Sequence, residues 1–248
     1  MQLGWATEYC PFCGKPKPAV DAPPPVSPKP EPTPTPPRQE QHPPQPRPVP
    51  SPIPPTSAVK LTRGGNISLS KHSPNLSRIL VGLGWKALAK PASDFELEAS
   101  VFMTAENGKV RGDEDFIFYN QLKSSCGSVE LIEDSKAWAK EGYVKVIKVN
   151  LSKLPSIIQR LSVSVTIYEA EARRQNFGQV KGAYIRIVAE ETGVEIARFD
   201  LSDNIGTETA MIFGEIYRRG AEWKFKAVGQ GYVGGLETLC HEFGVNVG

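Results

Sequence analysis

The chain has 248 residues and a formal net charge of +2, with 29 Lys and Arg spread among 27 Asp and Glu. This balance offers no basic patch of the kind that binds nucleic acid or an anionic membrane surface. No apolar run approaches the ~18 residues of a spanning helix, and the N-terminus lacks the apolar region of a signal peptide. We therefore expect a cytoplasmic protein, and the four Cys agree with a reducing compartment.

The first segment, residues 1–14, contains the stretch YCPFCG, in which Cys10 and Cys13 have the spacing of a zinc knuckle. Zinc takes four ligands and no second pair lies nearby, so this is half of a zinc-ribbon-like site. Three interpretations stay open: a first knuckle lies upstream of this sequence, two chains each donate a pair and so dimerise, or the motif holds no metal. A redox CxxC is disfavoured, because no βαβ pattern surrounds it.

Residues 15–57 are rich in proline, since all Pro of the chain except Pro74, Pro91 and Pro155 lie at or before Pro55. The segment has no periodic apolar pattern and cannot bury enough surface to offset the entropy of ordering. We predict a disordered linker biased to polyproline II, about 130 Å long if fully extended. Its P-x-x-P arrangements could dock on aromatic grooves, but a semi-rigid spacer is the simpler interpretation.

Residues 58–248 are dominated by an alternation of apolar and polar side chains, which predicts β-strands. The strand candidates in chain order are ILVGLGW (79–85), FELEASVFM (95–103), DFIFYN (115–120), YVKVIKVNL (143–151), RLSVSVTIYEA (160–170), AYIRIVAEE (183–191), EIARFDL (195–201), AMIFGEIY (210–217) and EWKFKAVG (222–229). Helical pattern is limited to a short turn after Pro155 and a final helix of about ten residues after GYVGG. We expect an all-β fold, a β-sandwich of two antiparallel sheets with a short C-terminal helix.

The same region offers little catalytic chemistry. It contains only His72 and His241, and it lacks both a G-x-S-x-G elbow and an H-E-x-x-H motif. The glycines of GQGYVGG are not followed by the Lys-Ser/Thr of a phosphate loop, so a tight turn from strand to helix is their simpler role. Cys126, in the turn SSCGS, is the candidate for thiol chemistry in this domain. We predict that the protein is not an enzyme.

Several long blocks resemble the TerD family of tellurium-resistance and stress-response proteins. They are LTRGGNISLSK (61–71), VGLGW (81–85), DFIFYNQLKSSCGSVE (115–130), EARRQNFGQVKGAYIRI (171–187) and TETAMIFGEIYRRGAEWKFKAVGQGYVGGL (207–236), and the resemblance covers nearly all of residues 60–245. It implies a β-sandwich, calcium binding by acidic loops at one end, and resistance to tellurite and other chemical stress rather than catalysis. It also implies partners among other stress-response proteins, in a complex that could be peripheral to a membrane.

The resemblance places the calcium ligands at Glu96, Glu98, Asp113, Asp115, Asp134 and Glu141. This sequence departs from the family there: Glu-Leu-Glu at 96–98 replaces Asp-x-Asp, and the loop EDSKAWAKEGY (133–143) replaces one rich in Asp and Gly. The same region brings in four cations, Lys86, Lys136, Lys140 and Lys145. Each nearby cation lowers the affinity for a divalent ion by about 1 kcal/mol or more. We therefore expect calcium binding to be weak or lost, with ammonium groups neutralising the carboxylates.

Three functions follow from these observations. The first is a non-catalytic binding or scaffold domain for the stress response, tethered by the linker to the zinc-knuckle-like segment. The second keeps a calcium-dependent switch, in which the metal orders the loop and changes a binding surface. The third is a thiol-dependent enzyme that handles tellurium oxyanions through Cys126, and it is the least favoured because no other redox group accompanies that thiol.

Overall fold

The computed structural model describes residues 58–87, 95–132, 144–201 and 206–247. The zinc-knuckle-like segment 1–14 and the linker 15–57 lie outside these ranges, as do Asp134 and Glu141 of the expected calcium ligands. Two of the cations noted above, Lys136 and Lys140, also lie outside them.

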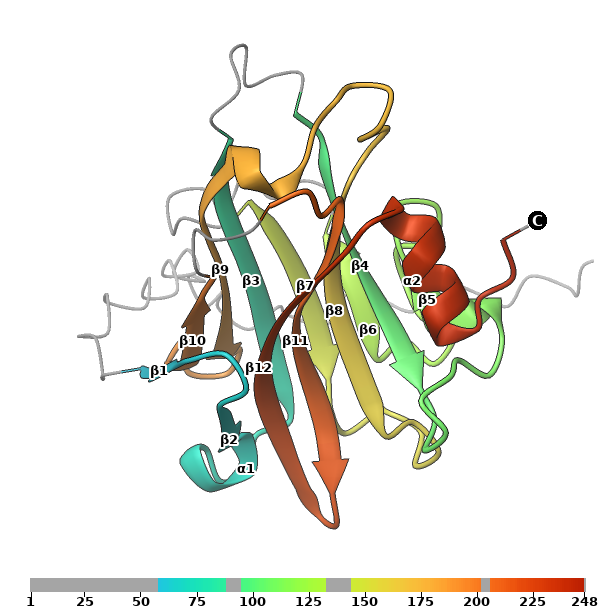
Figure 1. Ribbon diagram of the computed structural model, residues 1–248. Coiled ribbons are helices and arrows are strands. Elements are labelled where there is room, and N and C mark those ends of the chain that lie inside the picture. The colour runs from blue at the N-terminus through green and yellow to red at the C-terminus, as the bar shows by residue number, and fades with distance from the viewer. Residues whose placement is uncertain (1–57, 88–94, 133–143, 202–205, 248) are drawn as a thin grey trace, which may run out of the picture. The chain divides into compact units, whose positions relative to one another are not determined.

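The described chain forms two six-stranded sheets that pack face to face, as Figure 1 shows. The first sheet has the order β1 (Val59–Leu61), β10 (Glu195–Asp200), β9 (Val180–Ala189), β3 (Arg78–Ala87), β7 (Lys145–Asn150) and β6 (Val129–Ile132). The second has the order β2 (Asn66–Ser68), β12 (Glu222–Tyr232), β11 (Ala210–Arg219), β8 (Arg160–Ile167), β4 (Leu97–Thr104) and β5 (Phe116–Ile117). The expected β-sandwich is confirmed.

Helices are few and short in the described ranges. The α-helices are α1 (Leu69–His72) and α2 (Gly235–Phe243), and single 3-10 turns occur at η2 (Asp113–Asp115) and η4 (Phe177–Gln179). The expected C-terminal helix is therefore confirmed as α2. The turn after Pro155 stays a turn and does not become a helix, and α1 was not predicted.

One strand pairing departs from the expected antiparallel sheets. The edge strand β1 runs parallel to β10, with Val59 opposite Ala197, whereas the other strand pairs of both sheets are antiparallel. A hairpin turn forces its two strands to be antiparallel, but β1 and β10 are far apart in sequence and no such turn constrains them. The local sequence pattern therefore could not predict the direction of β1.

The main core lies between the sheets and is built from alternate residues of each strand. In β4, Leu97, Ala99, Val101 and Met103 all point into it, as the alternation required. The intervening side chains of β4 point to the outer face of the second sheet, where Phe102 belongs to a separate apolar cluster.

Helix α2 covers the part of that outer face around Phe102, so the second sheet is buried on both sides there (Figure 1). The rings of Phe102 and Phe243 stack with centroids 4.4 Å apart, and Phe102 and Phe116 stack at 4.5 Å. The helix also buries hydroxyl side chains of the outer face: the Oγ atoms of Ser100 and Ser164 are 2.7 Å apart, which satisfies both. The alternating pattern of these strands predicts that the serines face solvent, but helix α2 places them in the interior.

Glycines make the turn from β12 into α2, as the sequence suggested. Gly234 has φ of 98°, and a Cβ at this position would lie 2.3 Å from the Oγ1 atom of Thr238. The N–H of the next residue, Gly235, donates to Oγ1 of Thr209 at 2.9 Å. Only glycine tolerates both the left-handed backbone and the close approach, so the helix can start directly at the end of the strand.

Candidate functional site

Glu98 is held by a cation from the opposite sheet. Its Oε2 atom lies 2.9 Å from Nζ of Lys145, the first residue of β7, and both side chains are partly buried. Because β4 and β7 belong to different sheets, this ion pair links the two sheets. The prediction that lysine would neutralise the carboxylates of this region is confirmed for Glu98 and Lys145.

Glu96 has a different cation. It lies just before β4, and its Oε2 atom is 3.5 Å from Nη1 of Arg173, in the segment that follows β8. The guanidinium of Arg173 also approaches Glu169 at 3.3 Å and lies over the ring of Tyr168, 5.1 Å from its centroid. Each of the two neighbouring glutamates is therefore neutralised by its own cation, Arg173 for Glu96 and Lys145 for Glu98, rather than by one ion shared between them.

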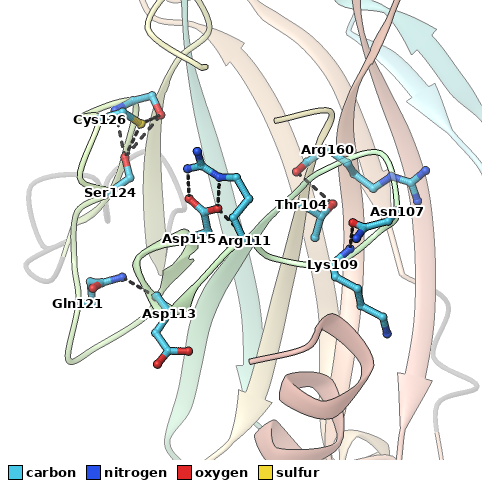
Figure 2. Close-up of polar contacts among 11 residues, drawn as sticks. Thr104, Asn107, Lys109, Arg111, Asp113, Asp115, Gln121, Ser124, Cys126 and Arg160 are labelled. Carbon is cyan, nitrogen blue, oxygen red and sulfur yellow. Dashed lines mark hydrogen bonds and ion pairs between the residues drawn. The ribbon is translucent and has the colours of Figure 1, made fainter. Parts of the chain in front are cut away.

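Asp115 is committed to an internal ion pair. It is 1% exposed, and Arg111 donates to both carboxylate oxygens, from Nε to Oδ2 and from Nη2 to Oδ1, each at 2.6 Å. Figure 2 shows the guanidinium and the carboxylate facing each other in a fork. This pair raises the pKa of the Arg111 guanidinium, chiefly through the hydrogen bonds to Asp115.

Asp113 has an exposed side chain that points away from Asp115, as Figure 2 shows. Its carbonyl oxygen accepts a hydrogen bond from Nε2 of Gln121 at 3.1 Å. The strand register separates both aspartates from Glu98, because Phe116 of β5 pairs with Phe102 of β4. Glu98 is four residues away along β4, about 13 Å at ~3.3 Å per residue.

The described residues alone bring no group of expected calcium ligands together, and Asp134 and Glu141 lie outside the described ranges. Calcium takes six to eight oxygens at about 2.3–2.6 Å, so its carboxylate ligands must converge. Among residues 58–87, 95–132, 144–201 and 206–247, no three His, Cys, Asp or Glu side chains are placed to hold one metal ion. Glu96 and Glu98 stay close to each other, and Asp113 and Asp115 form a second, distant group.

The cation partners Arg111 and Arg173 were missed by the sequence reasoning, which considered only lysines. A signal for Arg111 was present: Arg111 and Asp115 are four residues apart in RGDED, a spacing that brings side chains together on a turn of helix. Arg173 carried no such signal, because it meets Glu96 only where the antiparallel pairing of β4 with β8 brings the start of β4 beside the end of β8.

The Cys126 thiol lies in a turn made by small hydroxyl residues, seen at the upper left of Figure 2. Its sulfur is 2.9 Å from Oγ of Ser128 and 3.5 Å from Oγ of Ser124. Burial opposes ionisation of this thiol, but the hydrogen bonds with Ser124 and Ser128 outweigh it and lower the pKa of Cys126. In contrast, burial raises the pKa of the Cys240 thiol, on the buried face of helix α2, to about 11.

Known proteins resemble this chain over the whole sandwich. Residues 57–243 match the family model of the TerD domain. The chain is 51% identical to tellurium resistance protein TerD of Serratia marcescens over 189 residues, which are 76% of this chain and 98% of that protein. It is 46% identical to general stress protein 16U of Bacillus subtilis over 191 residues, 77% of this chain and 99% of that protein.

A solved structure supports the fold. The crystal structure of a homologue of telluride resistance protein from Streptomyces coelicolor superposes with a TM-score of 0.53 at 18% identity, over 66% of this chain and 95% of that one. In the described part of this chain, no helix has the length and apolarity needed to cross a membrane.

Proposed function

Because the chain belongs to the TerD family, we propose that it is a stress-response and tellurium-resistance protein whose sandwich acts as a non-catalytic binding or scaffold domain. Its Lys and Arg side chains take over the charge-neutralising role of calcium, so that this end of the domain keeps its shape without the metal. The observation that carries this proposal is the 2.9 Å ion pair between Glu98 and Lys145.

The charge arrangement supports the loss of calcium affinity. A divalent ion that used Glu98 would first have to displace the ammonium group of Lys145, and it would then sit close to that group. Repulsion between two cations at such distances costs about 1 kcal/mol or more at a partly buried site. Glu96 requires a second displacement, because Arg173 lies 3.5 Å from its carboxylate.

Calcium titration of the full chain by isothermal calorimetry tests this proposal. We expect no saturable binding at micromolar calcium for the unmodified chain. Lys145→Gln removes the competing ammonium group and should increase calcium uptake, whereas Lys148→Gln on the same strand is a matched control that leaves Glu98 paired. Saturable micromolar binding by the unmodified chain would contradict the loss of calcium affinity and favour the calcium-dependent switch.

The non-catalytic role is tested in a tellurite-sensitive bacterial host that expresses the full chain. If the domain protects by binding partners, Cys126→Ser should leave tellurite resistance and cellular tellurite reduction unchanged. Loss of both with Cys126→Ser, at equal protein level, would support the thiol-dependent enzyme.

The metal content of the N-terminal segment is a separate part of the proposal. Cys10 and Cys13 are proposed as a zinc half-site that two chains complete together. Metal analysis of the purified chain should then find about half a zinc atom per chain, and sedimentation should show a dimer that Cys13→Ser converts to a monomer. A monomer without zinc would contradict this pairing.

A further inference from the structure

A long groove runs beside helix α2 on the outer face of the second sheet. It consists of two neighbouring depressions of about 630 and 700 Å³ that share Tyr119, Leu236 and Glu237 in their walls. One extends toward Tyr168 and Glu171 after β8, and the other toward Asp113 before β5. We call this surface the α2 groove.

Its walls combine exposed apolar surface with a rigid base. Tyr119 is 47% and Tyr168 44% exposed, which is unusual for large aromatic side chains of a packed domain. Tyr119 is held in place by an edge-on contact with Phe118 at 5.1 Å, and Phe118 stacks on buried Phe116 at 4.4 Å. A surface that is already ordered loses little entropy when it binds a partner.

The groove is also acidic. No Lys, Arg or His is among its described lining residues. These residues include five with carboxylates, Glu98, Glu169, Glu171, Glu237 and Asp113. Glu98 and Glu169 are paired with Lys145 and Arg173. The other three form no ion pair with a Lys or Arg of the described chain; Glu237 has His241 at 3.7 Å, but both of these side chains are more than half exposed, so all three carboxylates are accessible to a basic partner.

The spacing of these carboxylates decides which kind of cation fits. They do not converge, since no three acidic side chains of the described residues are placed around one ion. They are distributed along two depressions on either side of Tyr119, which suits several cations carried on one extended chain. The same negative charge disfavours nucleic acid and anionic lipid.

We propose that the α2 groove docks an extended basic segment of another polypeptide. Lys or Arg side chains of that segment bind Asp113, Glu171 and Glu237, and apolar side chains between them pack on Tyr119 and Leu236. The inference rests on the proposed binding role and deepens it, because it names the surface and the chemistry of the partner.

The test is fluorescence anisotropy with the full chain and a labelled synthetic peptide in which Arg alternates with Leu and Pro. Glu171→Lys combined with Glu237→Lys should weaken binding about tenfold or more, and added salt should weaken binding to the unmodified chain. Glu106→Lys is the control for one charge reversal and is compared with Glu171→Lys alone, because Glu106 is exposed in a turn outside the groove. It should change affinity by less than about twofold at moderate ionic strength.

A second pair of variants tests the apolar contact. Tyr119→Ala should weaken binding severalfold, while Ile157→Ala, which removes a 53% exposed side chain elsewhere, should not. Circular dichroism checks that each variant is folded.

Three results would overturn the proposal. The first is that the peptide does not bind, and the second is that the groove variants and the control variants lose the same affinity for it. The third is that spermidine displaces the peptide at the same concentration of positive charge as the peptide requires for binding. The last would mean that the groove attracts charge without recognising a polypeptide. None of these results changes the calcium titration, so a failure here is distinguishable from a failure of the proposed function.

Discussion

The guanidinium of Arg111 and the carboxylate of Asp115 form a two-point ion pair with both contacts at 2.6 Å, and the carboxylate is 1% exposed. The pair closes the turn η2 that leads into β5. Removing the cation would leave a buried carboxylate without compensation, which is far more costly than losing a surface ion pair.

We therefore predict that Arg111→Met lowers the free energy of unfolding by about 3 kcal/mol. Lys123→Met is the matched control: Lys123 pairs with Glu130 at 3.3 Å and both side chains are about half exposed, so its loss should cost about 1 kcal/mol or less. Urea unfolding of both variants at neutral pH measures the difference. Equal effects would mean that Asp115 is rehydrated when its partner is lost.

The two described cysteines should differ sharply in reactivity. The pKa of Cys126 is lowered and its thiol is partly exposed, whereas the pKa of Cys240 is raised to about 11 by burial. Because the thiolate is the nucleophile, alkylation by iodoacetamide at neutral pH should modify Cys126 first and Cys240 only after unfolding. Peptide mapping by mass spectrometry identifies the modified residue.

The hydroxyl groups around Cys126 give this prediction a control. Ser128→Ala removes a hydrogen bond to the sulfur, so it should raise the pKa of Cys126 and slow its alkylation at neutral pH. Thr62→Ala, at an exposed position after β1 on the opposite edge of the first sheet, should leave the rate unchanged. Faster alkylation in Ser128→Ala would show that access, not ionisation, limits the reaction.

Helix α2 should be essential to the stability of the second sheet. Phe243 stacks on Phe102 at 4.4 Å and is buried together with Leu239 and Cys240. Phe243→Ala leaves a cavity over the sheet and should cost about 3–5 kcal/mol in urea unfolding. His241→Ala, on the solvent side of the same helix, is the control and should cost less than about 1 kcal/mol. A small effect of Phe243→Ala would mean that the helix detaches without weakening the sandwich.

Glu191 should make stability depend on pH in the acid range. Burial opposes its ionisation, but a 2.6 Å hydrogen bond from the Ser77 hydroxyl and the nearby Arg78 outweigh it, so the pKa of Glu191 is lowered. A folded-state pKa below the unfolded value, about 4.3, stabilises the fold above that pH. This contribution is lost as the pH falls through the lowered folded-state pKa.

Ser77→Ala should accordingly cost about 0.5–1 kcal/mol at pH 7, a modest value because Glu191 remains partly solvated. The cost should shrink as the pH falls from the unfolded-state value of about 4.3 through the lowered folded-state pKa of Glu191, below which Glu191 is protonated in both states. Urea unfolding of the variant and the unmodified chain across this range measures the change. A cost that does not vary with pH would show that the hydroxyl stabilises the fold independently of the Glu191 charge.

Local pattern was a good guide to the strands and to one helix. In β4 and β8 the apolar residues at every second position all face the core, because a strand alternates its side chains whatever surrounds it. The terminal helix was readable because glycines mark its start and its apolar residues follow helical spacing. The TerD resemblance correctly indicated the family from contiguous blocks of sequence.

Other features depended on contacts between distant segments. The serines of β8 look like a solvated face by pattern, yet Ser162 and Ser164 are fully buried because α2 folds back over them. The parallel pairing of β1 with β10 had no local signal either, since strand direction is set by the path of the chain between them.

For the acidic stretch around Glu96 and Glu98, the sequence by itself determined that two carboxylates follow each other at alternate positions and that lysines accompany the acidic residues of this region. Only the tertiary structure decided which cation meets which carboxylate: Lys145 from the opposite sheet for Glu98, and Arg173 for Glu96. The reason is that a strand's geometry is local, whereas an ion pair forms only where folding brings two segments within a few ångströms.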